Sequence, residues 1–351
     1  MSRSRKGTLQ DDGHLPARGR NAVFCNVEQL EIVEKIAKAG DPILPEWSQR
    51  SPDCLDLWPK TKSSPSGLVL EFARDSWGWL HLLSLDAPLV AVLWQLLFAR
   101  ALRAHLPPVV TLVTALVIWL IYVADRILDS YKSEEAADRA LRHRFYRAHR
   151  LAFLPAFLAV FLITGWLSYN DLGFRTWCDG LSLAAIVGGY FAVVHLLGGG
   201  AQKWFPKEIA VAVLFGTGTF MPVSVRVQQL HVRFLVPFLL FLLVLWMNTL
   251  FIEYSEWVTL RRREADRPHK STILMGQHLT GFGVCVGILA LCAVASHWFP
   301  RARSILVAEM LSALALAVLG WKWRRISSYA VRVVADLVLL TPLVLLVLFR
   351  K

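Results

Sequence analysis

Four acidic side chains, arranged as two pairs, are the residues of this chain best suited to chemistry. Asp125 and Asp129 lie in the segment IYVADRILDS, and Glu253 and Glu256 lie in FIEYSEWVTL. Each pair ends a long apolar run and precedes a basic stretch. Because residues three or four apart share one face of a helix, the two acids of each pair should project together. The spacing predicts two acidic helix faces.

Two such faces brought together would repel each other unless a cation lay between them. Oxygen-only ligation suits Mg²⁺, which usually binds one or two carboxylates plus the phosphates of a substrate. We therefore predict that these four acids are catalytic and bind Mg²⁺ together with a diphosphate substrate. Nearby basic residues are the candidates for binding the diphosphate, because cations stabilise the departing anion: Arg126, Lys203, Lys207, Arg261 and Lys270.

The composition predicts an integral membrane protein. Of the 351 residues, 55% are hydrophobic and only 18% are charged, which is too apolar for one soluble domain. Helices satisfy their own backbone polar groups in lipid, so an all-α, multi-pass bundle is expected. Nine apolar runs have the length of about 17 to 25 residues that a bilayer requires: 88–106, 107–124, 151–169, 181–197, 209–225, 234–252, 279–299, 305–321 and 333–349.

The distribution of basic residues predicts the orientation. Cytoplasmic loops carry an excess of Lys and Arg. The segments after the second, fourth, sixth and eighth runs hold 18 of the 38 Lys and Arg residues, whereas the opposite side holds 9. Both acidic pairs should therefore face the cytoplasm from the plasma (inner) membrane. The net charge of +12 then reflects topology and attraction to anionic membrane lipid, and we expect no nucleic-acid partner.

The chain is expected to have two parts. Residues 1–80 form a polar extension with a possible amphipathic helix at 27–39 and a proline-rich linker at 41–67, and residues 81–351 form the transmembrane domain. The first 20 residues lack the apolar core of a signal peptide. The five cysteines are scattered without paired spacing, so they predict no metal site and no disulfide.

The two acidic motifs give the segment 85–349 a resemblance to the UbiA-type intramembrane prenyltransferases. Residues 124–129 correspond to the family's first motif, Asn-Asp-x-x-Asp-x-x-x-Asp, and Glu253, Glu256 and Asp266 correspond to the second. A basic position after the fourth helix falls at Lys203 or Lys207. The resemblance implies a nine-helix bundle that transfers a prenyl chain, with Mg²⁺, from a prenyl diphosphate to a lipophilic, often aromatic acceptor.

The sequence departs from that pattern at several positions. Ala124 stands where asparagine is usual, Leu128 occupies an expected acidic position, Lys132 follows where a third acid is possible, and the second motif uses glutamates. Fewer carboxylates imply weaker metal binding or a single ion. A catalytically silent binding or scaffold protein and an intramembrane terpene cyclase are therefore the alternatives. A transporter is disfavoured, because no pair of runs is broken in corresponding halves.

Several of these residues also have ordinary structural explanations. Asp125 and Asp129 suit interfacial pairs with Arg126 or the basic stretch 142–150, and Glu253 and Glu256 suit surface pairs with residues 261–263.

Two further polar residues lie inside the apolar runs. Asp336 would cost about 2.5 to 3.5 kcal/mol in a membrane helix, and Arg332, one turn earlier, offers it a structural partner. His195 is expected to be a buried histidine that shares hydrogen bonds. Aromatic residues in or near the relevant runs are candidates for shielding an allylic cation, although single aromatics near span ends are more often interface anchors: Trp119, Tyr122, Tyr190, Phe191, Trp246, Phe251 and Tyr254.

Overall fold

A computed structural model describes residues 80–81, 83–131, 150–196, 206–227, 232–259, 268–326 and 328–348. These residues belong to one compact unit, Ser63–Lys351. The predicted amphipathic helix at 27–39 and the linker at 41–67 lie outside the described residues. Every regular element in the described part of the chain is a helix, which confirms the predicted all-α class.

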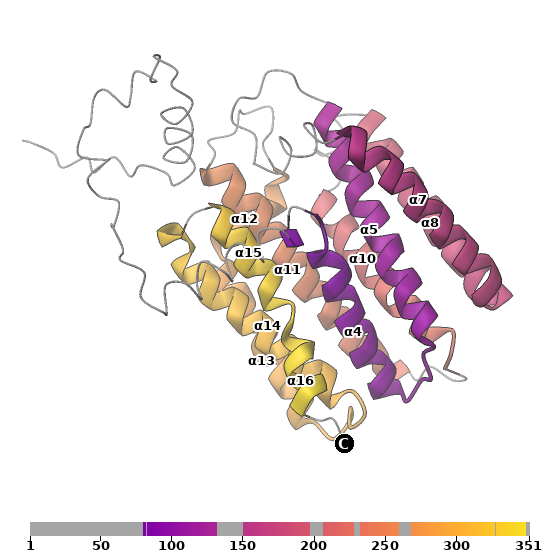
Figure 1. Cartoon of the computed structure of the whole chain (residues 1–351). Helices are drawn as coiled ribbons and strands as arrows, with labels where there is room; N and C mark the ends of the chain where they lie inside the picture. Colours follow the sequence, from indigo (N-terminus) through magenta and orange to yellow (C-terminus); the bar gives the residue numbers. More distant parts are fainter. Residues whose placement is uncertain are drawn as a thin grey trace, which may run out of the picture. The chain divides into compact units, whose positions relative to one another are not determined.

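Figure 1 shows how the helices follow one another along the chain. The α-helices are α4 (Asp86–Leu102), α5 (Pro108–Tyr131), α7 (Arg150–Asp171), α8 (Phe174–Leu196), α10 (Lys207–Ser224), α11 (Leu235–Thr259), α12 (Lys270–Gln277), α13 (Leu279–Ala295), α14 (Arg303–Lys322), α15 (Ser328–Val338) and α16 (Thr341–Leu348). Two short 3₁₀ turns, η1 (Val232–Phe234) and η3 (Trp323–Arg325), precede α11 and follow α14.

Fewer helices have the length and apolarity of a membrane span than the sequence predicted. Each of the nine predicted runs overlaps a helix, yet only six described helices are long and apolar enough to cross a membrane, or seven if the bent pair of α12 and α13 is one span. The two predicted spans that fall short are α4, with 17 residues, and α10, with 18 residues that include the charged Lys207 and Glu208. The result supports a multi-pass membrane protein.

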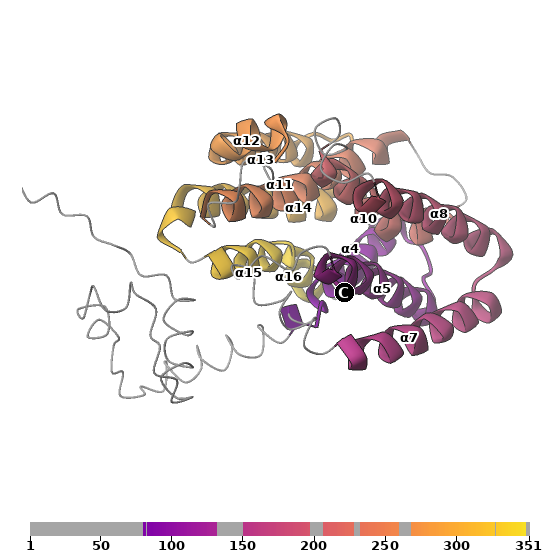
Figure 2. The same cartoon turned by 90° about the horizontal axis from the view of Figure 1, so that it is seen from above.

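Helix α4 is short because it lies inside the bundle. It packs against α5, α10, α14, α15 and α16, and Figure 2 shows it near the middle of the helices when they are seen from above. Its Trp94 and Phe98 are fully buried and stack with Phe241 of α11, with ring centroids 4.5 and 5.2 Å apart. Such a helix is held by protein contacts and needs no full-length apolar surface for lipid.

By contrast, α7 and α8 lie at the edge of the bundle. Few residues in their apolar stretches are buried, 11% and 6% respectively, so most of their surface is available to lipid. Helix α7 packs against α5, and α8 packs against α10. Figure 2 shows that α7 and α8 are joined at one end and diverge from there, α7 toward α5 and α8 toward α10.

The last predicted run is broken between α15 and α16, at residues 339 and 340. Breaks inside a membrane are tolerated where neighbouring side chains bind the freed backbone groups. Trp94 Nε1–H donates to the carbonyl of Leu339 at 2.9 Å, and the hydroxyl of Ser312 donates to the carbonyl of Val338 at 3.1 Å. Helices α4 and α14 therefore hold the break in place.

We expect Trp94→Phe to lower the free energy of unfolding by about 1 to 3 kcal/mol, because it leaves the buried carbonyl of Leu339 without its donor. Unfolding in detergent, followed by intrinsic fluorescence and circular dichroism, measures the loss. Trp321→Phe is the matched control, since Trp321 is 73% exposed. Equal effects of the two substitutions would contradict the role given to the Trp94 hydrogen bond.

Candidate functional site

Several predicted site residues lie near the ends of α5, α8 and α11 and at the start of α10. Asp125 lies in the C-terminal part of α5, with its side chain 47% exposed and its Oδ1 3.5 Å from Nε2 of His195 on α8. Glu253 of α11 forms an ion pair with Lys207, the first residue of α10, at 3.1 Å. Ends of four helices thus contribute charged groups to one end of the bundle.

The side chain of His195 is enclosed, as the sequence predicted, but the predicted hydrogen bonds of its ring are not found in the described part of the chain. Its side chain is 8% exposed, and its ring lies 5.7 Å from that of Phe191, one turn earlier on α8. In the described part of the chain its two ring nitrogens make no hydrogen bond, and Asp125 is its charged neighbour. The Asp125–His195 contact joins α5 to α8, and the Lys207–Glu253 ion pair joins α10 to α11.

The structure corrects the interpretation of Asp336 and Arg332. Arg332 was expected to pair with Asp336 on the same helix, but its guanidinium instead binds the carboxylate of Glu256 on α11. Asp336 accepts a hydrogen bond from Asn248 Nδ2 at 3.2 Å and lies 3.8 Å from His81. The helical spacing alone was misleading because both residues have better placed partners on other elements.

The other predicted residues have varied surroundings. Arg126 is buried, with 7% exposure, and its charge acts on Asp86 and Asp336. Lys270 is exposed at the start of α12. Asp129 lies within α5, and its side chain is not described, whereas Lys203 and Arg261 lie outside the described residues. Their roles stay predictions.

Among the predicted acids, Asp125 lies beside His195, whereas Glu253 and Glu256 form ion pairs with Lys207 and Arg332. Among the described side chains they do not form a group of three ligands within reach of one ion, since the group that does is composed of His81, Asp86 and Asp336. Mg²⁺ accompanied by a diphosphate requires only one or two protein carboxylates. The half-exposed Asp125 therefore remains suited to that role.

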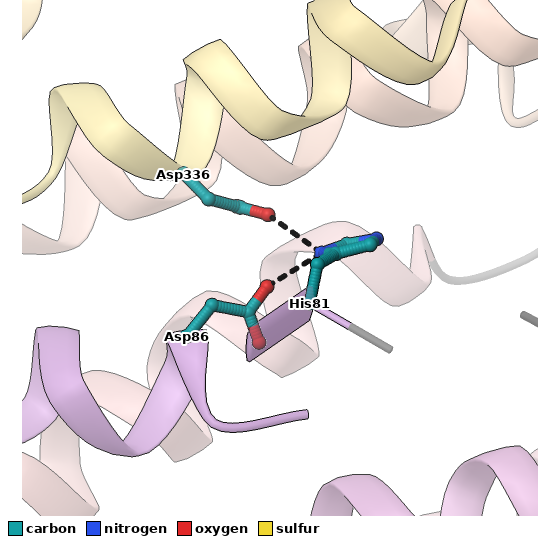
Figure 3. A group of neighbouring side chains, drawn as sticks. All are labelled: His81, Asp86 and Asp336. Carbon is teal, nitrogen blue, oxygen red and sulfur yellow. Dashed lines mark hydrogen bonds and ion pairs between the residues drawn. The ribbon is translucent and has the colours of Figure 1, made fainter. Parts of the chain in front are cut away.

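The group of His81, Asp86 and Asp336, here called the His81 cluster, was not predicted from the sequence. Nδ1 of His81 lies 2.7 Å from Oδ2 of Asp86 and 3.8 Å from Oδ2 of Asp336 (Figure 3). His81 precedes α4, Asp86 is the first residue of α4, and Asp336 comes from α15. His81 and Asp86 are 3% and 5% exposed, so this is a buried polar centre.

One signal in the sequence pointed to this cluster. An ionisable residue inside an apolar run is by default a functional-site candidate, and Asp336 lies inside the last run. His81 and Asp86 gave no comparable signal, because they precede the apolar part of the first run. Only packing of α4 against α15 brings the three residues together.

An apolar cavity of about 490 Å³ lies between α5, α7, α8 and α10. This is within the size range of small-molecule sites, about 300 to 1,000 Å³. Its described lining contains no charged side chain, and includes Tyr122, Tyr190 and Phe191. Ala124 and Phe191 line the cavity next to Asp125 and one turn from His195, so charged groups border one end of an apolar space.

Comparisons of the chain with protein-family models, with curated proteins and with solved structures found no match.

Proposed function

We propose that the protein is an integral membrane prenyltransferase, which transfers an isoprenoid chain from a prenyl diphosphate to a lipophilic acceptor. The single observation that carries the proposal is the cavity between α5, α7, α8 and α10, which is apolar along its lining and bordered by charge at one end. A prenyl diphosphate has the same division, with a long apolar chain and a highly charged head.

The diphosphate would lie at the end of the cavity near Asp125. Lys207 begins α10 at this end, and it is the described predicted cation best placed for a phosphate. Lys203 and Arg261 are assigned to the same role on sequence grounds. Mg²⁺, held by one or two of the predicted carboxylates, supplies charge neutralisation of the departing diphosphate.

The aromatic lining suits the reactive chain. Cleavage of the C–O bond leaves an allylic cation, which must be kept from water and which is attracted to aromatic faces. Of the aromatics singled out from the sequence, Tyr122, Tyr190 and Phe191 line the cavity. By the distribution of Lys and Arg, the charged end of the cavity faces the cytoplasm, where soluble diphosphates are available.

A specific observation favours one second candidate, a binding protein without catalysis. The described acids at this end are held in pairs with His195, Lys207 and Arg332. Ion-paired carboxylates are less available to a metal than free ones. Such a protein would retain the lipid in the cavity and would not release diphosphate.

The test uses purified full-length protein in lipid nanodiscs, supplied with geranyl, farnesyl or longer prenyl diphosphates, an aromatic lipophilic acceptor and Mg²⁺. We expect diphosphate release that stops with EDTA and that falls by at least about 100-fold in Asp125→Asn, in line with loss of charge stabilisation at a transition state. Asp171→Asn, at an exposed acid that ends α7, is the matched control.

The outcomes separate the candidates. Binding of prenyl diphosphate without release, in wild type, would support the binding protein and contradict the transferase. Release that ignores both EDTA and Asp125→Asn, or the absence of any binding, would overturn the assignment of the cavity. Release without an acceptor, giving a cyclic hydrocarbon, would identify a terpene cyclase instead.

A further inference from the structure

The His81 cluster lies outside the cavity and is not used by the proposed transferase. Its three side chains come from the segment before α4, from the start of α4 and from α15. One ligand atom from each of the three residues lies within 4.8 Å of the others. Figure 3 shows Asp86 and Asp336 approaching the imidazole of His81 from two different helices.

The separations match those of ligands around one metal ion. For bonds of about 2.1 Å, neighbouring nitrogen and oxygen ligands lie about 3.0 to 3.4 Å apart in octahedral or tetrahedral geometry. The distances from His81 Nδ1 to the two carboxylates, 2.7 and 3.8 Å, lie on either side of that range.

Two buried oxygen atoms beside the cluster provide a second, independent observation. Asp86 Oδ1 and Asn248 Oδ1 have no hydrogen-bond partner in the described part of the chain, although both residues are at least 95% buried. Buried polar atoms without a partner are rare and cost about 1 to 3 kcal/mol each. Asn248 already donates to Asp336, so its free carbonyl oxygen belongs to the same polar centre.

The charges also favour a cation. Asp86 is buried and the Asp336 side chain is only 19% exposed, and among the described residues the charge of Arg126 acts on both carboxylates. With both carboxylates ionised, as metal binding requires, and a neutral imidazole at His81, these four groups would carry a net charge of −1. Buried carboxylates are normally compensated by pairing or by a metal. Neutral imidazole is also the form of histidine that binds metals.

From these observations we infer that His81, Asp86 and Asp336 bind one divalent transition-metal ion. A ligand set of one imidazole and two carboxylates suits Zn²⁺ or Mn²⁺, since imidazole favours zinc and carboxylates favour the harder manganese. The ion would connect the segment before α4 to α15, close to the break that Trp94 holds. This inference does not depend on the proposed transferase activity.

The experiment uses the full chain in detergent, stripped with a chelator and titrated separately with Zn²⁺, Mn²⁺ and Co²⁺. Calorimetry measures stoichiometry and affinity, and Co²⁺ absorption reports its ligands. We expect one ion per chain, with affinity reduced at least 10-fold in His81→Ala, Asp86→Asn and Asp336→Asn. Asp171→Asn is the matched control, because Asp171 is an exposed acid at the end of α7 that belongs to neither the His81 cluster nor the proposed Mg²⁺ site, so its loss should leave the affinity unchanged.

Wild-type protein keeps the test decisive if a variant misfolds. A bound ion should raise the melting temperature of wild type progressively as its concentration rises, because it binds only the folded state. Absence of stoichiometric binding to wild type would overturn the site. The site would also be overturned if Asp86→Asn and Asp336→Asn bound the ion as tightly as wild type does. If Asp125→Asn stops diphosphate release while the His81 cluster still binds its ion, the two proposals concern separate sites and can fail independently.

Discussion

Replacement of Gly188 by phenylalanine is expected to weaken prenyl diphosphate binding by about 100-fold, equivalent to about 3 kcal/mol of steric conflict with the ligand. Gly188 lines the cavity from α8, and a Cβ atom there meets no atom within 4 Å. The larger side chain therefore enters space that the bound chain would occupy. Because phenylalanine favours helix more than glycine does, the fold should tolerate it.

The neighbouring residue provides the control. A Cβ atom at Gly189 would also meet no atom within 4 Å, but Gly189 is not among the residues that line the cavity. Gly189→Phe should therefore leave binding unchanged. Binding of a radiolabelled prenyl diphosphate to nanodiscs, with melting temperatures for each variant, measures both effects. Equal loss in the two variants, or no loss in either, would show that the ligand does not occupy the cavity.

Substitution of Arg332 by alanine is expected to cost about 3 to 5 kcal/mol of stability, the usual penalty for leaving a buried charge without its partner. The Glu256 side chain that it binds is only 7% exposed. This pair also joins α15 to α11, so its loss would loosen the helix that carries Asp336. Chemical unfolding in detergent measures the change.

Two comparisons test this explanation. Lys207→Ala breaks a more exposed ion pair, with side chains 32% and 15% accessible, and should cost less. A double variant, Glu256→Gln with Arg332→Gln, removes both charges and should be more stable than Arg332→Ala. The pair does not stabilise the fold as proposed if Arg332→Ala lowers the free energy of unfolding no more than Lys207→Ala does. The same conclusion follows if the double variant is no more stable than Arg332→Ala.

The sequence predicted much of the fold from composition and run length. Membrane helices can be recognised in this way, because lipid allows almost only apolar surface on a helix that satisfies its own backbone. The prediction failed where packing replaces lipid. Helix α4 packs against five other helices, and α10 begins with the charged Lys207 and Glu208, so neither has the surface of an independent span.

The candidate site was less predictable, because spacing along one helix cannot reveal contacts between helices. Asp125 and Lys207 were recognised from their positions near basic stretches, and the structure gives them charged partners. The predicted pairing of Asp336 with Arg332 was wrong. Arg332 binds Glu256 of α11, and Asp336 lies beside His81, which precedes α4. The relation between the two acidic motifs stays a prediction, with the Asp129 side chain not described.

The residue types by themselves determined that this chain has several helices long and apolar enough to cross a membrane, because that property depends mainly on composition and length. Tertiary structure alone decided which buried acid meets which base. His81, Asp86 and Asp336 are separated by up to 255 positions in the sequence and come together only when α4 packs against α15. Electrostatic interactions depend on distance in space, and distance along the chain does not report it.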